Sequence, residues 1–360
     1  MGHVRRAPSG RYEARYRSVN GIEHSQRFTT KREAQRFLER IGAEQQRGDW
    51  CDPSGGRIRL GDWIEQWSAT TVHLRPSSQA RDESYIRNHV LPTFATIPIG
   101  RITQLDVRAW VADLSASGLA PATVQKSYQT LSKILRSAMD ANLLPQTPCR
   151  NISLPRVERK EMRFLTPAEI ARLASAITPR YRALILLDAY CGLRLGELAG
   201  LRRSRLDIDG RSVRVAEIAV EVRGRMTVGP PKTRAGHRTV PMPRFVAEAM
   251  NQHLAHYCVE EADPFVFGGS DGGVLRANAW RSRHWRTSVR AAGLQPLRPH
   301  DLRHTAVSLW IAVGARPNQI AAWAGHTSVS VVLDRYGHLF PGHETDVLDR
   351  LDALGSSLEP

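Results

Sequence analysis

The pattern of hydrophobic and polar positions divides the chain into a short strand-rich beginning and a longer, mainly helical remainder. Residues 11–18, RYEARYRS, alternate apolar with charged side chains, which is the period of a strand with one buried face. Thr30 and Glu33 then form the capping box of a helix. The apolar face predicted for that helix consists of Ala34, Phe37, Leu38 and Ile41. We therefore predict a small β-sheet backed by one helix over residues 1–56.

Helical periods take over after the break at DPSGG. We predict a helical domain over residues 57–150 and an extended basic linker over residues 151–162. A third domain is predicted over residues 163–345, in which residues 211–241 form a three-stranded sheet. An acidic tail occupies residues 346–360. The predicted fold class is α+β: a mainly helical third domain with a small three-stranded antiparallel sheet, preceded by the helical domain and the small N-terminal β-sheet/helix domain.

Local signals fix where several of these helices begin. Further helix starts are predicted at Thr103 with Asp106, Pro121, Thr166 with Glu169, and Pro299. The helix that begins at Pro299 is expected to bury Leu302, Leu309, Trp310 and Val313. Exposed basic residues of the second domain, Arg81, Arg87, Lys126, Lys133 and Arg136, can contact phosphates or simply face solvent.

The charge of the chain favours a polyanionic partner. Lys and Arg number 51 against 35 Asp and Glu, which gives a formal net charge of +16. Nucleic acid is the first candidate, an anionic membrane the second, and a solvated basic surface the alternative. The longest apolar stretch is interrupted by Asp188 and too short to span a bilayer, and the N-terminus has no apolar signal segment. We therefore expect no membrane association and a cytoplasmic location.

One tyrosine and five polar residues upstream of it suggest a reaction at a phosphodiester. The tyrosine is Tyr336, and the others are Arg194 in CGLRLGEL, Lys232 in PPKTRAGHRTVP, His300 and Arg303 in RPHDLRHT, and His326 in WAGHT. Arginine forks bind phosphate bidentately and would stabilise its transition state. A tyrosine hydroxyl, with a pKa of about 10, needs help to lose its proton, and a lysine could protonate the leaving oxygen. Such a transfer needs no nucleotide cofactor.

Competing interpretations exist for several of these residues. His300 and His304 are four apart, as in a metal site, but Asp301 stands where a metalloprotease helix has glutamate, and Arg303 would put a cation beside the metal. We therefore predict no metal, and we expect His304 either to pack in the core or to support a neighbouring catalytic residue without reacting itself. Arg234 competes with Lys232, and His338 and His343 are possible substitutes for His326. The four cysteines are widely spaced, which favours reduced thiols over a zinc or disulfide framework.

The order and spacing of these fragments resemble the tyrosine recombinases, the family of phage and plasmid integrases. The resemblance implies that Tyr336 attacks DNA to leave a 3′-phosphotyrosyl link, with Arg194, Lys232, His300, Arg303 and His326 as the other catalytic residues. It also implies an arm-type DNA-binding domain at 1–56, a core-binding (SAM-like) domain at 57–150 and a catalytic domain at 163–345. The sequence departs from the family at Ala324, where LGH is usual and AGH is found.

The same resemblance implies partners and leaves alternatives open. The expected partners are double-stranded DNA attachment sites, three further protomers in a homotetramer on DNA, and DNA-bending accessory proteins. A type IB topoisomerase would share the phosphotyrosyl chemistry, but its site resembles this one less at His300. The alternative from another functional class is a DNA-binding protein that organises or represses its sites without catalysis.

Overall fold

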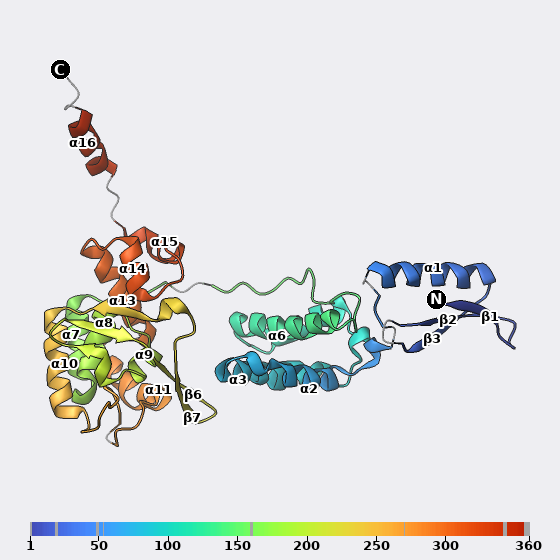
Figure 1. The fold of residues 1–360 in the computed structure, drawn as a ribbon. Helices are drawn as coiled ribbons and strands as arrows, with labels where there is room; N and C mark the ends of the chain where they lie inside the picture. The colour runs from blue at the N-terminus through green and yellow to red at the C-terminus, as the bar shows by residue number, and fades with distance from the viewer. Residues whose placement is uncertain are drawn as a thin grey trace. The chain divides into compact units, whose positions relative to one another are not determined.

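The computed structural model describes residues 2–18, 21–47, 50–52, 54–158, 161–269, 271–340 and 344–355. The chain divides into two compact units, residues 1–159 and 160–360, coloured blue to green and green to red in Figure 1. The division falls inside the linker predicted at 151–162. Each unit is described below by itself.

The first unit begins with the predicted sheet and helix. Strands β1 (His3–Arg6), β2 (Tyr12–Arg17) and β3 (Glu23–Phe28) pair antiparallel in that order, and α1 (Lys31–Arg47) packs against them. Their shared core contains Ala14, Tyr16, Ala34, Phe37, Ile41 and Trp50. On the opposite face of β2, the Glu13 carboxylate accepts hydrogen bonds from Arg5 and Arg15. Part of the arginine charge on this face is therefore neutralised within the sheet.

The rest of the first unit is helical. Its elements are η1 (Gly55–Arg57), α2 (Leu60–Thr70), η2 (Thr71–His73), α3 (Pro76–Tyr85), the π-helical turn η3 (Ile86–Val90), α4 (Leu91–Phe94), η4 (Ile99–Arg101), α5 (Gln104–Ala116) and α6 (Pro121–Asp140). The capping box predicted at Thr103 and Asp106 is present, and Pro121 opens α6. The buried face of α6 includes Leu131, Ile134, Leu135 and Ala138, as predicted.

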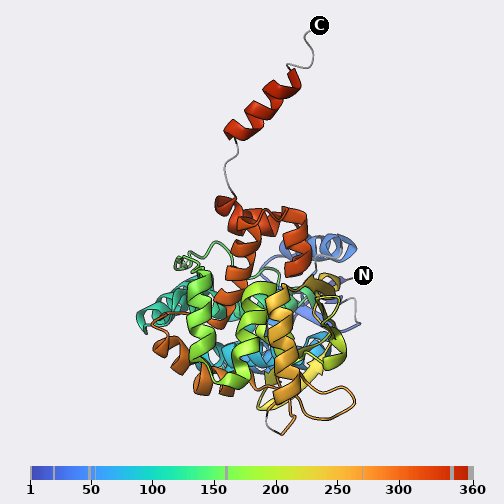
Figure 2. The same cartoon turned by 90° about the vertical axis from the view of Figure 1, so that its left-hand side faces the viewer.

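The second unit is mainly helical and has its own core. Its helical elements are α7 (Pro167–Ala176), η5 (Pro179–Tyr181), α8 (Arg182–Cys191), α9 (Leu195–Ala199), η6 (Arg203–Arg205), η7 (Arg234–Gly236), α10 (Arg244–Tyr257), α11 (Ala277–Trp280), the π-helical turn η8 (Arg281–Trp285), α12 (Arg286–Ala291), α13 (Pro299–Ala312), α14 (Pro317–Ala324), α15 (Ser330–Tyr336), η9 (Gly337–Leu339) and α16 (Glu344–Gly355). Helix α8 is the centre of this unit and packs against α7, α10 and α13. Figure 2 shows α8 standing between α7 and α10.

The strands of the second unit differ from the prediction. Residues 211–241 were expected to form one three-stranded sheet, but they divide between two sheets. Strands β4 (Leu206–Asp207), β5 (Ser212–Val215) and β8 (Arg238–Pro241) form one sheet, while β6 (Ile218–Val222) and β7 (Arg225–Gly229) pair only with each other. The run RSVRVAEIAVEV is therefore two strands, because the chain leaves the first sheet after Val215 and begins a separate hairpin that turns at Arg223 and Gly224, both at positive φ.

One predicted core position in α13 is wrong. Leu302 and Trp310 are buried and Leu309 is partly buried, but Val313 is 82% exposed. Helix α13 ends at Ala312, so Val313 occupies the C-cap and Gly314 continues at a φ of +83°. The buried face of the helix therefore ends at Ile311, two residues before the pattern suggested. Of the tail predicted at 346–360, residues 356–360 lie outside the described part of the chain, and the rest belongs to α16. Among the described residues, no helix combines the length and the apolarity needed to cross a bilayer.

The fold class predicted from the sequence, α+β with a mainly helical domain and small antiparallel sheets, is confirmed.

Candidate active site

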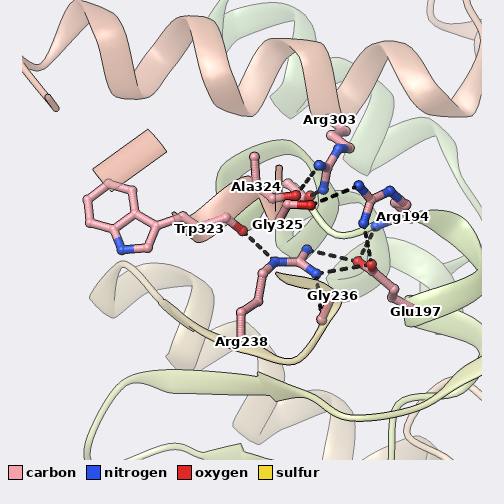
Figure 3. A network of polar contacts seen from close by, with 9 residues as sticks. Arg194, Glu197, Gly236, Arg238, Arg303, Trp323, Ala324 and Gly325 are labelled. Atoms are coloured by element: carbon pink, nitrogen blue, oxygen red, sulfur yellow. Dashed lines mark hydrogen bonds and ion pairs between the residues drawn. The ribbon is translucent and has the colours of Figure 1, made fainter. Parts of the chain in front are cut away.

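Three arginines from separate elements converge on the C-terminus of α14. The Trp323 carbonyl accepts a hydrogen bond from Arg238 Nε at 2.6 Å, the Ala324 carbonyl accepts one from Arg303 Nη2, and the Gly325 carbonyl accepts one from Arg194 Nη2 at 3.4 Å. Figure 3 shows the three guanidinium groups around this turn. The last carbonyls of a helix lack partners within the helix and carry its negative dipole end. They therefore offset some of the repulsion among three neighbouring cations.

Two glycines at helix ends make this convergence possible. Gly192 ends α8 and Gly325 ends α14, both in the left-handed conformation at a φ of +63°. A Cβ at Gly325 would lie 2.8 Å from the Ala235 carbonyl oxygen, so a side chain there would be both strained and too close. The Gly192 carbonyl accepts a second hydrogen bond of Arg303, from Nη1 at 2.5 Å.

Glu197 supplies the negative charge inside this group. Its carboxylate accepts hydrogen bonds from Arg194 Nη1 at 2.8 Å, from Arg238 Nη1 at 3.0 Å and Nη2 at 2.8 Å, and from the Arg194 backbone N–H at 2.8 Å. The last bond closes a capping box at the start of α9. Burial by itself would raise the pKa of Glu197, but Arg238 and Arg194 outweigh it and lower that pKa to about 2. Glu197 therefore holds two arginine side chains in fixed positions as a buried anion.

Arg303 is the most enclosed of the three arginines. The residue is 3% exposed, and burial, with Arg194 and Arg238 nearby, lowers the pKa of Arg303 to about 9. Asp188 of α8 lies close enough to Arg303 for their charges to interact, and burial raises the pKa of this carboxyl well above its ordinary value despite the attraction of Arg303. A guanidinium has five N–H donors, so the two carbonyl contacts of Arg303 leave donors for an incoming anion. The side chain of Arg194 is 42% exposed and opens the group to solvent.

His326 lies directly after the turn that binds the arginines. Its backbone N–H donates to the Ala321 carbonyl at 2.9 Å, which closes the C-terminal turn of α14 and fixes the position of the residue. The Nδ1 atom of its ring is buried and, within the described structure, has no hydrogen-bond partner. Burial and the neighbouring Arg303 and Arg194 lower the pKa of His326 to about 4. A neutral imidazole with an unpaired nitrogen therefore stands beside a cluster of cations, an arrangement suited to a bound anion.

Tyr336 ends α15 with its side chain inside the protein. The residue is 1% exposed, and its hydroxyl lies 2.6 Å from Nδ1 of His304. Burial raises the pKa of Tyr336, while Arg303 and Arg335 oppose the rise. Tyr336 is therefore within the electrostatic field of Arg303, and α13 carries both Arg303 and the histidine that contacts the tyrosine.

The remaining predicted residues, His300 and Lys232, lie in different surroundings. His300 lies near the start of α13, its ring 4.6 Å from that of His304, and lines a cavity of about 330 Å³ together with Arg281 and Arg298. Burial, with the positive charges of Arg303 and Arg194, lowers the pKa of His300. Lys232 is exposed in the loop between β7 and η7. That loop continues into Ala235, which packs against Gly325.

Sequence reasoning missed parts of this group. Nothing in the sequence distinguishes Arg238 from Arg234, and nothing in it pairs Arg238 with Glu197. The sequence suggests packing or a supporting role for His304, but it does not identify the Tyr336 hydroxyl as the group that its ring contacts. His343 lies outside the described residues. No group of three or more metal-ligating side chains occurs in the described ranges.

Comparisons with known proteins agree with this arrangement. The phage integrase family model matches residues 163–343, the phage integrase N-terminal domain matches residues 1–47, and the phage integrase N-terminal SAM-like domain matches residues 59–115. The chain is 28% identical over 367 residues to the putative prophage phiRv2 integrase of Mycobacterium tuberculosis, covering 100% of this chain and 97% of that protein. It is 24% identical to the integrase of Mycobacterium phage D29, covering 98% and 96% of the two chains.

Solved structures share the fold. The Tn1549 transposon integrase in complex with a circular intermediate DNA superposes with a TM-score of 0.71 at 19% identity, over 82% of this chain and 99% of that one. A lambda integrase dimer bound to a COC′ core site gives a TM-score of 0.59 at 16% identity, over 92% and 93% of the two chains. Together with the family model and the relatives above, this fold defines the class of protein, a site-specific tyrosine recombinase. Since the phage integrase model alone covers half of the chain, the protein belongs to the phage integrase family.

Proposed function

We propose that this recombinase cleaves and rejoins DNA with Tyr336 as its nucleophile. The hydroxyl attacks a phosphodiester, forms a 3′-phosphotyrosyl link and releases a 5′-hydroxyl. The observation that carries this assignment is the junction at α14 and α13. There, Arg194, Arg303 and His326 surround one helix end, and Arg303 also faces the buried Tyr336. A phosphodiester placed at this junction would meet cations on one side and the tyrosine on another.

The electrostatics of the junction suit the transition state better than the ground state. Negative charge builds on the non-bridging oxygens as the new bond forms, and fixed donors aimed at those oxygens are the main catalytic device for such reactions. In the DNA-free protein, Arg194 and Arg303 donate to backbone carbonyls. A phosphate oxygen carries more charge than a carbonyl oxygen and makes the stronger hydrogen bond. The lowered pKa values of His300 and His326 keep both rings uncharged. A bound anion would raise these pKa values, and a protonated ring would then donate a further hydrogen bond to it.

Lys232 is proposed as the general acid for the leaving 5′-oxygen. Its side chain is exposed, which is consistent with a group that meets the substrate only when DNA is bound. The loop that carries it leads within three residues to Ala235, which packs against Gly325 at the arginine cluster. We propose that this loop moves when DNA binds and brings the ammonium group to the phosphate. The proton transfer would then balance the loss of the tyrosine proton.

The other parts of the chain are proposed to bind and organise DNA. Residues 1–56 would bind arm-type sites and residues 57–150 the core sites, with 151–162 as linker, 163–345 as the catalytic domain and 346–360 as a tail. The net charge of +16 for the whole chain supports contact with DNA phosphates. Four protomers would assemble on double-stranded attachment sites, assisted by DNA-bending proteins, to integrate or excise a phage or mobile element in the cytoplasm.

A suicide substrate tests the nucleophile directly. Tyr336→Phe removes one hydroxyl, so we expect DNA affinity to persist and the covalent protein–DNA adduct to disappear. Tyr181→Phe is the matched control, because Tyr181 is also a buried tyrosine of the same unit, at 8% exposure, and its adduct yield should equal that of the wild type. EDTA should leave wild-type cleavage unchanged. An adduct formed by the Tyr336→Phe protein would assign the reaction to another residue, and a chelator-sensitive reaction would contradict a metal-free mechanism.

A further inference from the structure

Within the described residues, His304 is the one hydrogen-bond partner of the Tyr336 hydroxyl. The distance between Nδ1 and Oη is 2.6 Å, and the two rings tilt at 52° with centroids 5.8 Å apart. Both groups are buried, at 6% exposure for His304 and 1% for Tyr336. His304 comes directly after Arg303 on α13, while Tyr336 lies 32 residues further along the chain on α15. The end of α15 therefore approaches α13 closely enough to give the tyrosine oxygen a histidine partner.

We propose that His304 is the general base that accepts the Tyr336 proton during strand cleavage. This role rests on the proposed function of Tyr336 as the nucleophile. His304 would then take part in the reaction as a catalytic residue, rather than act only as the packing or supporting residue that the sequence suggests.

The step balances without any added reactant. As Tyr336 Oη forms a bond to phosphorus, the electron pair of its O–H bond stays with the oxygen, and the proton moves to Nδ1 of His304. The bond between phosphorus and the 5′-oxygen breaks, and that oxygen takes a proton from Lys232. Religation reverses each transfer: the 5′-hydroxyl returns its proton to Lys232, and His304 returns its proton to the tyrosine. The protein therefore leaves the cycle in its starting protonation state.

The protonation states of the resting protein agree with this direction of transfer. Burial, followed by the neighbouring His300, lowers the pKa of His304 to about 4, so its ring is neutral at pH 7. A neutral Nδ1 can accept the hydrogen bond that the phenol donates. The charged and titratable groups facing His304 are His300, Asp301 and Arg298 from the first turn of α13, and Arg335 with Tyr336 from α15. A phosphate bound at Arg303 would add negative charge beside them and raise the basicity of the ring when the proton has to move.

His300 is the competing base on the same helix. Its ring meets that of His304 edge to face at 4.6 Å, with an interplanar angle of 79°. It faces the cavity it shares with Arg281 and Arg298, whereas His304 faces the tyrosine. The two histidines therefore face different parts of the site, and only His304 contacts the nucleophile in the described structure.

Single-turnover adduct formation on a suicide substrate, measured from pH 6 to pH 9, separates these roles. His304→Asn places an amide oxygen where Nδ1 stands, so it keeps an acceptor for Tyr336 but cannot hold a proton. We expect the rate at pH 7 to fall about 100- to 10,000-fold, with DNA affinity and melting temperature near wild type. The variant rate should rise about tenfold per pH unit as hydroxide replaces the base, while the wild-type rate stays flat. His300→Asn, the matched variant, should lower the rate by a factor that does not change with pH.

Peptide mapping of the wild-type adduct distinguishes a failure of the proposed role of His304 from a failure of the proposed role of Tyr336. With the adduct mapped to Tyr336, a His304→Asn rate within threefold of wild type at pH 7 would overturn the role of His304 while leaving the proposed function intact. If the cleavage rate of the His300→Asn protein rises with pH instead, His300 rather than His304 would be the general base. A faster rate in His304→Asn would show that the contact restrains the tyrosine. An adduct mapped to any other residue would overturn both proposals together.

Discussion

Replacing Glu197 with glutamine should remove a large part of the stability of the catalytic unit. The carboxylate is 2% exposed and accepts three side-chain hydrogen bonds from two arginines. Its pKa falls from 4.5 to about 2, and each unit corresponds to about 1.4 kcal/mol, so the charged form contributes about 3 kcal/mol. Glu197→Gln also leaves the Arg238 guanidinium, whose side chain is 5% exposed, without a counterion. Breaking a buried ion pair in this way costs about 3 to 5 kcal/mol, which agrees with the first figure.

The pH dependence of this effect has a defined sign. The folded-state pKa lies below the unfolded value, so the stabilisation is fully present above pH 4.5 and is lost as pH falls toward 2. The wild type should therefore lose its advantage over Glu197→Gln within that window. At pH 7 the difference in unfolding free energy should be about 3 kcal/mol, and near pH 2 it should approach zero.

Urea unfolding of the full chain at several pH values, followed by pulsed hydrogen exchange, measures this difference. Peptides that cover α9 and β8 report the second unit even while the first unit unfolds independently. Glu169→Gln is the matched control, since Glu169 also closes a capping box, on α7, but its side chain is 22% exposed and glutamine can keep the cap. We expect the control to lose less than about 1 kcal/mol. A Glu197→Gln penalty below 1 kcal/mol at pH 7, or one equally large at pH 3 and pH 7, would refute the reasoning.

Two further predictions concern the leaving group and the front domain. A substrate with sulfur at the bridging 5′ position should rescue cleavage by the Lys232→Ala variant, because a thiolate leaves without protonation. It should not rescue the Arg194→Ala variant, because the charge lost there acts on the non-bridging oxygens. Equal rescue of both variants, or of neither, would remove Lys232 from the general-acid role. A chain that starts at residue 57 should cleave core sites yet lose binding to distal sites, with a shallower salt dependence of DNA binding. Unchanged affinity and salt slope would instead make residues 1–56 a packing module.

Features with local causes could be predicted from the sequence. The capping boxes at Thr103 and Thr166 depend on side chains three residues apart, and both are present. Pro299 opens α13 for an equally local reason, since its missing N–H is not needed at the first turn of a helix. The division of residues 211–241 into two sheets depends instead on which strands meet in space. A strand pattern specifies an apolar face but not a pairing partner.

The contacts inside the site were hidden for the same reason. Arg238 meets Glu197 across 41 residues, and His304 meets Tyr336 across 32. Each pair requires helices and strands to be placed first, and no spacing rule connects residues so far apart. The sequence singles out Arg194, Arg303, His326 and Tyr336 because the order and spacing of their motifs resemble those of a known family. Their catalytic roles stay predictions that the adduct experiments decide.

The departure at Ala324 shows why the site tolerates some changes and not others. The residue is 1% exposed, and what it gives to Arg303 is its backbone carbonyl, which any amino acid provides. A different side chain there alters packing at the end of α14 without removing an acceptor. Gly325 is the opposite case, because its φ of +63° and its close approach to Ala235 both exclude a side chain. The backbone of the turn between α14 and His326, more than its side chains, therefore sets where the arginines point and where a phosphate would bind.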